Sequence, residues 1–310
     1  MICYTIVSNI CIIRTLKKSV DEVKVLHIDQ FEEQGGTLNF YCNDFKSHLN
    51  DHFHSITHAH KHDFFLTVVF TAGSGTHEID FAKFPIRPGS VFMMSPGQVH
   101  SWTFTDDIDG FIFFHSQEFF DKHYAARSIY QFPFFYSTQN SPGLQLGSKQ
   151  VEKLMGYFEE LLKESENQNA LAYQKLVTLV DLIYLDLSNW YLQEPTHAAI
   201  GAGGYSAKLR ELGRFIDENF VENKSAAFYA DKMNITTKHL NRIVKTTLDQ
   251  TTSSLILNRV ILEAKRRIVY ENGDLSQIAY SFGYEDYAYF SKLFKARTGF
   301  TPKGFRAKYK

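Results

Sequence analysis

The sequence predicts a multidomain α and β protein with an N-terminal antiparallel β-barrel, a helical hairpin and a C-terminal all-α domain. Three observations predict it: short apolar runs between Gly and Pro turns, then apolar residues at helical spacing, then a two-helix unit that occurs twice. A chain of 310 residues is about two domains long, since one core serves about 100–200 residues. We expect a lead-in at 1–24, the barrel at 25–140, the helical region at 141–192, a linker at 193–206 and the last domain at 207–310.

The composition excludes several classes of protein. With 44% hydrophobic and 22% charged residues, the chain is neither disordered nor built to span a membrane. Its N-terminus has no basic region before an apolar stretch and no small-residue cleavage site, so we expect no export. Only Cys3, Cys11 and Cys42 occur, which predicts reduced thiols in the cytoplasm and no disulfide framework.

The barrel prediction depends on β-branched and aromatic runs in the first half of the chain. Runs of this kind at 64–71, 76–80, 91–94 and 111–115 are separated by Gly and Pro turns. Short strands at this spacing are typical of an antiparallel sandwich or small barrel. The aromatic-rich stretch 119–140 shows neither the alternation of a strand nor the spacing of a helix.

Helical periodicity begins after the barrel, at 151–164 and 170–192. Each segment places apolar residues on one stripe: Val151, Leu154, Met155, Phe158, Leu161 and Leu162 in the first, and Leu171, Leu176, Leu179, Val180, Ile183 and Leu187 in the second. Leu182 and Leu185 lie outside the second stripe, so that helix is apolar on two sides. We expect the second side to form a homodimer contact; the alternative is that both sides pack within one chain.

The charge balance changes sign at the predicted linker. Residues 206–310 carry 19 Lys and Arg against 11 Asp and Glu, whereas residues 1–205 carry 14 against 23. The segment between them, 193–206, contains Pro195 and three glycines and has no periodicity, as a flexible linker would. A basic domain beside an acidic one predicts a polyanionic partner, most often nucleic acid, although a solvated basic surface is the alternative.

The basic domain contains a duplicated helix-turn-helix pattern. Such a motif needs a small residue in its first helix, a residue that tolerates a left-handed turn, and apolar anchors on its second helix. These appear in order twice, as Ala230, Asn234, Leu240 and Val244, and as Ala279, Gly283, Phe290 and Phe294. A helical segment at 255–270 separates the units and would be about 24 Å long, which suits recognition helices about one DNA turn apart.

Six side chains point away from the apolar anchors of the two second helices. They are Lys238, Asn241 and Arg242 in the first unit and Tyr287, Ala288 and Lys292 in the second. Asn pairs well with adenine, Arg with guanine and Lys with phosphate, while Tyr and Ala suit thymine methyl groups. We therefore predict them as DNA contacts; the alternative is ordinary solvent exposure.

Residues 278–306 resemble the signature of AraC/XylS-type transcriptional regulators. The matching residues are Ile278, Ala279, Gly283, Tyr284, Phe290, Phe294, Lys295, Gly299, Pro302, Phe305 and Arg306. The resemblance implies two helix-turn-helix units in successive major grooves of promoter DNA, with the six side chains above at the family's contacting positions. Asn234 stands where the family often has Gly, and Asn tolerates the same backbone.

The barrel segment contains alternating histidines, His58, His60 and His62, which face one side of a strand. The stretch 89–100, which ends at His100, resembles a conserved cupin motif, so the barrel is cupin-like. Two of these histidines with His100 could bind a metal, but the carboxylate that metal-binding cupins supply three or four residues later is absent or misplaced. We therefore expect no metal, no catalysis and no cofactor.

A pocket for a small effector is the better interpretation of the barrel. The candidate residues are His60, His62, His100, Trp102 and Phe111; the last two match aromatic positions that line the sugar site of the arabinose-type regulator. No arginine stands near Ala72, where that regulator supplies one, so a sugar is not expected. The alternative is that these side chains are ordinary barrel core and rim.

The sequence as a whole predicts a dimeric, effector-controlled transcriptional regulator that is not an enzyme. Its expected partners are promoter DNA, an effector of unknown identity, a second copy of the chain and RNA polymerase. Activation is the working assignment, although the sequence does not decide between activation and repression. The alternatives are a ligand-independent dimeric DNA binder and a metal-dependent cupin enzyme fused to a DNA-binding domain.

Overall fold

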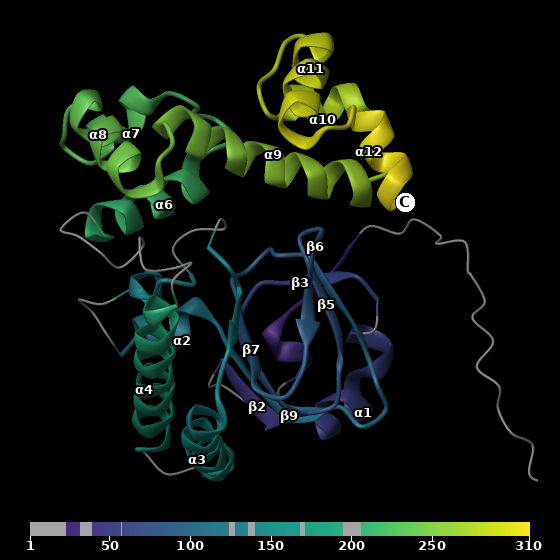
Figure 1. Ribbon diagram of the computed structural model, residues 1–310, viewed down its shortest axis with the longest axis vertical. Helices are drawn as coiled ribbons and strands as arrows, with labels where there is room; N and C mark the ends of the chain where they lie inside the picture. The colour runs from purple at the N-terminus through teal and green to yellow at the C-terminus, as the bar shows by residue number, and fades with distance from the viewer. Residues whose placement is uncertain are drawn as a thin grey trace, which may run out of the picture.

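The computed structural model describes residues 23–31, 39–56, 58–123, 128–135, 140–167, 171–194 and 206–310. A β-barrel with two long helices along one side forms one part, and an all-helical part lies across one end of the barrel (Figure 1). The expected lead-in as far as residue 22 and the expected linker between 195 and 205 lie outside the described residues, as do Cys3 and Cys11.

The barrel consists of two five-stranded sheets, in which all the paired strands are antiparallel except β1 and β3. The first sheet has the order β1 (Lys24–Leu26), β3 (His60–His62), β8 (His100–Phe104), β5 (Gly75–Ile79) and β6 (Ala82–Ile86). The second has the order β10 (Gly143–Gln145), β7 (Ser90–Met94), β4 (Phe65–Ala72), β9 (Asp109–His115) and β2 (Phe40–Asp44). The four predicted strands correspond to β4, β5, β7 and β9.

Alternation along the strands divides the apolar residues between two cores. On β9, Ile112 and Phe114 belong to the barrel interior, whereas Phe111 and Phe113 contact the helices outside. This is the period of two that a strand imposes on its side chains. Trp102 on β8 also lies in the barrel interior.

The segment expected to form the barrel also contains a helix for which the sequence analysis predicted no element. In α1 (Phe45–Ile56), Phe45, His48 and Ile56 are buried at helical spacing. The Asp44 carboxylate caps the helix by accepting the Ser47 N–H at 2.8 Å. The aromatic-rich stretch that fitted neither period contains the short helices α2 (Gln117–Asp121) and η2 (Ile129–Gln131), and a further turn, η1 (Ile28–Gln30), follows β1.

The two predicted helices, α3 (Ser148–Ser165) and α4 (Ala172–Gln193), cover the outer face of the second sheet (Figure 1). Phe158 of α3 and Tyr184 of α4 both contact Phe113. Leu171, which we expected in the buried stripe, is 57% exposed because it stands at the N-cap of α4. Leu182 and Leu185 are exposed on the outer side of α4.

The C-terminal part is all-helical. It comprises α6 (Ser206–Asn219), α7 (Ala226–Lys232), α8 (Thr237–Leu248), α9 (Thr252–Tyr270), α10 (Leu275–Ser281), α11 (Tyr287–Thr298) and α12 (Pro302–Tyr309). One apolar cluster runs through all seven helices, and α9 contributes Ile256, Val260, Ala264 and Ile268 to it. Of the helices in the described ranges, none combines the length and apolar character that crossing a membrane requires.

Candidate functional site

The first helix-turn-helix unit consists of α7 and α8. Ala230 of α7 is fully buried, and its single methyl group takes up little space between the two helices. Asn234 takes the left-handed conformation, with φ of 52°, which lets the chain turn sharply into α8. The Thr236 hydroxyl then caps α8 by accepting the His239 N–H at 3.1 Å. The unit therefore has the small residue and the left-handed turn that the pattern predicts, and a threonine hydroxyl caps its second helix.

The second unit, α10 and α11, repeats this construction. Ala279 is fully buried, and Gly283 has φ of 74°. A Cβ on Gly283 would contact only the Lys224 Nζ at 3.7 Å, so the backbone conformation and not crowding favours glycine there. Asp286 caps α11 by accepting the Ala288 N–H at 2.7 Å, and Phe290 and Phe294 are buried beneath it.

The side chains predicted to contact DNA lie on the outer surface of α8 and α11. Five are exposed, namely Lys238, Asn241, Arg242, Ala288 and Lys292, and Tyr287 is half-buried against the domain core. In Figure 1, α8 lies at one end of α9, and α11 lies on the side of α9 away from the barrel. Arg297, near the end of α11, donates hydrogen bonds to Ser254 and Asn258 of α9 at 3.0 and 3.2 Å. With 19 residues α9 is about 28 Å long. It begins three residues before the expected helix because Thr251 caps it.

The barrel interior brings four buried histidines together with Trp102. His60 and His62 come from β3, His77 from β5 and His100 from β8. His77 Nε2 and His100 Nδ1 share a hydrogen bond of 3.0 Å. The centroid of the His100 ring lies 4.2 Å from that of His60 and 4.8 Å from that of Trp102. We call these five residues the histidine cluster. His77 was not among the effector-binding residues predicted from the sequence, and the structure adds it to them.

Burial determines the charge of this cluster. It lowers the pKa of His60 to about 4 and of His62 to about 3, and holds the pKa of His77 and His100 well below the usual value. All four rings are therefore neutral at pH 7. His62 Nε2, His77 Nδ1, His100 Nε2 and Trp102 Nε1 are buried without a hydrogen-bond partner among the described residues.

Phe111 does not join the histidine cluster. It packs on Phe158 of α3, on the outer side of the second sheet. Its neighbour on β9, Ile112, is the residue that faces the interior. Within the described part of the chain, no group of three or more His, Cys, Asp or Glu residues is arranged to hold a metal ion.

Comparison with known families gives a match for each part. Residues 48–178 match the family described as an AraC-like ligand binding domain, and residues 229–308 match a helix-turn-helix domain. The chain belongs to the AraC family of transcriptional regulators. The HTH-type transcriptional regulator YfiF of Bacillus subtilis (strain 168) is 23% identical over 282 residues, with 88% of this chain and 85% of that protein covered. The HTH-type transcriptional activator RhaS of Citrobacter koseri is 25% identical over 257 residues, with 80% of this chain and 86% of that protein covered.

Solved structures of similar proteins include whole chains and isolated domains. ToxT from Vibrio cholerae, with bound unsaturated fatty acid, aligns over 87% of this chain and 95% of its own with 13% identity and a TM-score of 0.38. An AraC-type DNA-binding regulator from Chromobacterium violaceum aligns over 34% of this chain and 95% of its own, with 23% identity and a TM-score of 0.33.

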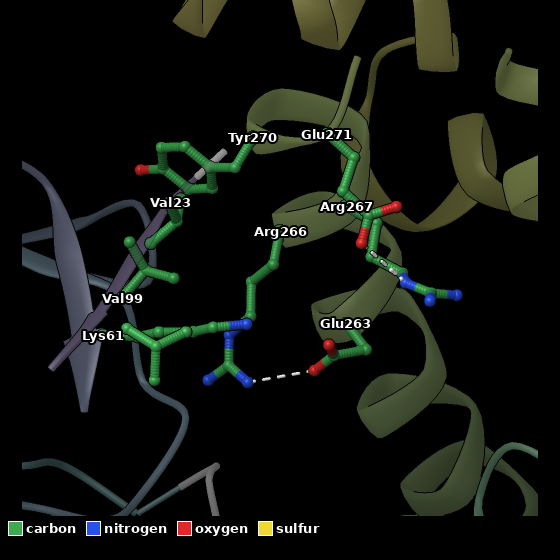
Figure 2. A pocket seen from close by; sticks show the side chains of 9 residues that line it. Val23, Lys61, Val99, Glu263, Arg266, Arg267, Tyr270 and Glu271 are labelled. Carbon is green, nitrogen blue, oxygen red and sulfur yellow. Dashed lines mark hydrogen bonds and ion pairs between the residues drawn. The ribbon is translucent and has the colours of Figure 1, made fainter. Parts of the chain in front are cut away.

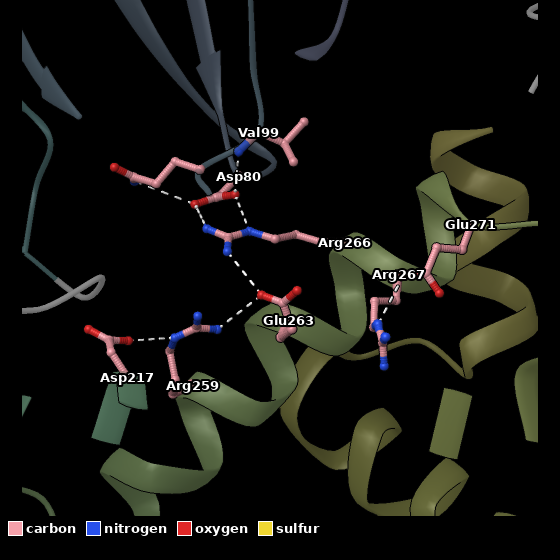
Figure 3. A network of polar contacts seen from close by, with 9 residues as sticks. Asp80, Val99, Asp217, Arg259, Glu263, Arg266, Arg267 and Glu271 are labelled. Atoms are coloured by element: carbon pink, nitrogen blue, oxygen red, sulfur yellow. Dashed lines mark hydrogen bonds and ion pairs between the residues drawn. The ribbon is translucent and has the colours of Figure 1, made fainter. Parts of the chain in front are cut away.

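This AraC-family chain also has a polar contact between its two parts that the sequence did not reveal. Arg266 of α9 donates two hydrogen bonds to the Asp80 carboxylate, of 2.7 and 2.6 Å, from Nε and Nη2 (Figure 3). Arg266 also binds Glu263, which binds Arg259, which binds Asp217 of α6 at 2.7 Å. Burial alone would lower the Arg266 pKa, but Asp80 and Glu263 outweigh it and raise that pKa, so the guanidinium stays charged.

Beside this contact a cavity of about 200 Å³ separates the barrel from α9. Lys61 and Val99 line its barrel wall, while Glu263, Arg267 and Tyr270 line its helical wall (Figure 2). Lys61 lies between His60 and His62, and Val99 precedes His100, so this wall is the outer side of the strands that carry the histidine cluster. The periodicity of α9 could not reveal the cavity, because its polar face is covered by another domain.

Proposed function

We propose that this chain binds promoter DNA with α8 and α11 in successive major grooves. The observation that carries the proposal is the pair of capped second helices, α8 and α11, whose outer surfaces are exposed and which the 19-residue α9 connects. Lys238, Asn241 and Arg242 would contact one groove, and Tyr287, Ala288 and Lys292 the next. The hydrogen-bond donors of the Lys, Asn and Arg side chains suit base edges and phosphates, and the apolar surfaces of Tyr287 and Ala288 suit thymine methyl groups.

The histidine cluster is the proposed effector site. Four buried ring nitrogens there have no hydrogen-bond partner in the part of the chain that the structure describes, and such atoms are costly to bury unless a ligand or water satisfies them. Trp102 Nε1 can only donate a hydrogen bond, so the effector must offer at least one acceptor. His60, His62, His100 and Trp102 remain the proposed contacts, His77 is added, and Phe111 is left out because it faces α3.

We propose further that two copies associate through the outer side of α4. Leu182 and Leu185 are 40% and 46% exposed there, one helical turn apart on the face opposite the barrel. The dimer would act in the cytoplasm, where promoter DNA and RNA polymerase are. An effector can control it only by binding one arrangement of barrel and helical domain better than another. No enzymatic step is part of this proposal.

The proposal is tested by measuring the affinity of the full chain for a promoter fragment at several salt concentrations. If α8 and α11 bring about 6–10 phosphate contacts, affinity falls by about 10³–10⁵ between 50 and 200 mM salt. A flat response would show that the basic domain does not bind the DNA backbone. The thermal stability of the same protein, screened against small polar metabolites, separates effector control from ligand-independent binding, because a ligand of the cluster raises it.

A further inference from the structure

The turn between β5 and β6 makes the contact with the helical domain. Its two residues, Asp80 and Phe81, have φ of 48° and 73°, and Ile79 pairs with Ala82 on either side of them. Left-handed φ values are rare for non-glycine residues, and least common for bulky ones such as Phe. Backbone of this kind is concentrated at sites where the surroundings hold it in place.

Both residues of the turn are held by the helical domain. The Asp80 and Arg266 side chains are only 11% and 8% exposed, so their ion pair is shielded from solvent and its geometry is bidentate. The Phe81 ring packs against Tyr270 of α9 and against Phe305 and Tyr309 of α12, with ring centroids 5.1 to 5.8 Å apart. The contact therefore combines a directional ion pair with an aromatic cluster.

The same turn is tied directly to the strands of the histidine cluster. The Asp80 N–H donates to the Val99 carbonyl at 2.8 Å, and the Asp80 carboxylate accepts the Val99 N–H at 3.2 Å. Val99 precedes His100 on β8, and His77 lies three residues before Asp80 on β5. These two histidines are hydrogen-bonded to each other, and His100 pairs with Ile79 across the strands.

We propose that the Asp80–Phe81 turn is a clamp through which the histidine cluster sets the position of the DNA-reading domain. A displacement of His77 or His100 moves the ends of β5 and β8, and with them the carboxylate that holds Arg266. Opening the clamp frees α9 and α12 from the barrel, and so changes where α8 and α11 lie. The proposal depends on the proposed function only for its consequence at DNA, since the clamp itself can be tested without DNA.

The test measures the distance between the two parts of the full chain by pulsed electron paramagnetic resonance, without DNA. Spin labels are placed on the exposed positions Lys122 and Lys295, after Cys3, Cys11 and Cys42 are replaced by Ser. We expect one narrow distance distribution for this parent protein. Asp80→Asn, which keeps the size of the side chain and suits a left-handed backbone, should broaden the distribution and shift it to longer distances. Phe81→Ala should act in the same direction.

The decisive variant is His77→Gln, which does not touch the helical domain. It should broaden the distance distribution as Asp80→Asn does. If His77→Gln does not fold, the same distance distribution is measured on His77→Phe, which retains a ring. His115→Gln is the matched control, because His115 is also buried but binds Tyr184 in the other core. Asp186→Asn is the control for carboxylate loss, because Asp186 pairs with Lys153 between α3 and α4.

The outcomes separate the clamp from the proposed function. A distribution that stays narrow in Asp80→Asn, or in both His77 variants, would overturn the proposal. Equal broadening in His115→Gln would also overturn it, since the effect would then be a general loosening of the barrel. If the parent protein binds no DNA while the variants behave as expected, the clamp stands and the proposed function fails.

Discussion

At the scale of single residues, the barrel depends on histidines that remain uncharged. The pKa of His48 is lowered to about 3 and that of His115 to about 4, mainly by burial, as for the histidine cluster. An unfolded chain exposes the same rings, which then titrate near pH 6.5. Below that pH the unfolded state binds more protons than the folded state, and stability falls.

We therefore expect the free energy of unfolding to decrease as the pH is lowered from 6.5 toward 4.5. Each histidine that stays neutral in the folded state contributes a slope of about 1.4 kcal/mol per pH unit over that range. Urea unfolding followed by tryptophan fluorescence at several pH values measures the total slope. Replacing His62 with Phe should reduce it by one histidine's share, and an unchanged slope would contradict the assigned neutrality of that ring.

Arg242 provides the residue-scale test of base recognition. If it contacts a guanine, Arg242→Ala should relax the preference at one base pair by about 1–3 kcal/mol and leave other positions unchanged. Competition binding with single-base variants of a selected site measures this. Arg214→Ala is the matched control, because Arg214 is on α6 and pairs with Glu218. Uniform weakening across all sequences would instead make Arg242 a phosphate contact.

Single residues were predictable where local spacing alone decides their environment. The outward positions on α8 and α11 follow from the buried anchors, which are themselves spaced three or four residues apart on one face of each helix, so five of the six are exposed as expected. Phe111 shows the limit, because alternation leaves two possible faces and only the tertiary structure shows which is inside. Asp80 and Arg266 are 186 residues apart, and no local pattern links them.

At the scale of elements, the strands and helices with a clear period were predictable, and those that depend on packing were not. The runs that became β4 and β7 are apolar along most of their length and end at Gly or Pro turns. In α1, by contrast, His48 is one of the three buried residues at helical spacing, and an apolar pattern does not count a histidine. The duplicated unit was the clearest case, because its turns require Asn234 and Gly283 in left-handed backbone.

The outer face of α4 gives the element-scale prediction. If two copies meet there, replacing Leu182 and Leu185 together with Asp should convert dimers to monomers. Burial of each leucine contributes about 1.5–3 kcal/mol, so the dissociation constant should rise by at least about 10²-fold. Analytical ultracentrifugation measures the association. Val221→Asp is the control, since Val221 is 39% exposed but lies in the helical domain; a dimer that survives the double substitution would exclude this face.

At the scale of the whole molecule, the split of charge along the chain corresponds to two structural parts. The basic part carries α8 and α11, and the acidic part carries the histidine cluster and the α4 face. Their mutual position could not be predicted from the sequence, because it depends on contacts between residues far apart in the chain, such as those of the Asp80–Phe81 turn with α9 and α12. That contact leaves five of the six proposed DNA contacts exposed, so the docked arrangement does not cover them.

The central claim is that α8 and α11 enter successive major grooves, and guanine-N7 methylation interference tests it most directly. The N7 atoms lie in the major groove, so methylation blocks contacts made there. On a site selected by the full chain at low salt, interfering guanines should form two groups about 10–10.5 base pairs apart on one face of the duplex for each subunit. A single group per subunit, or no interference on tightly bound DNA, would contradict the account.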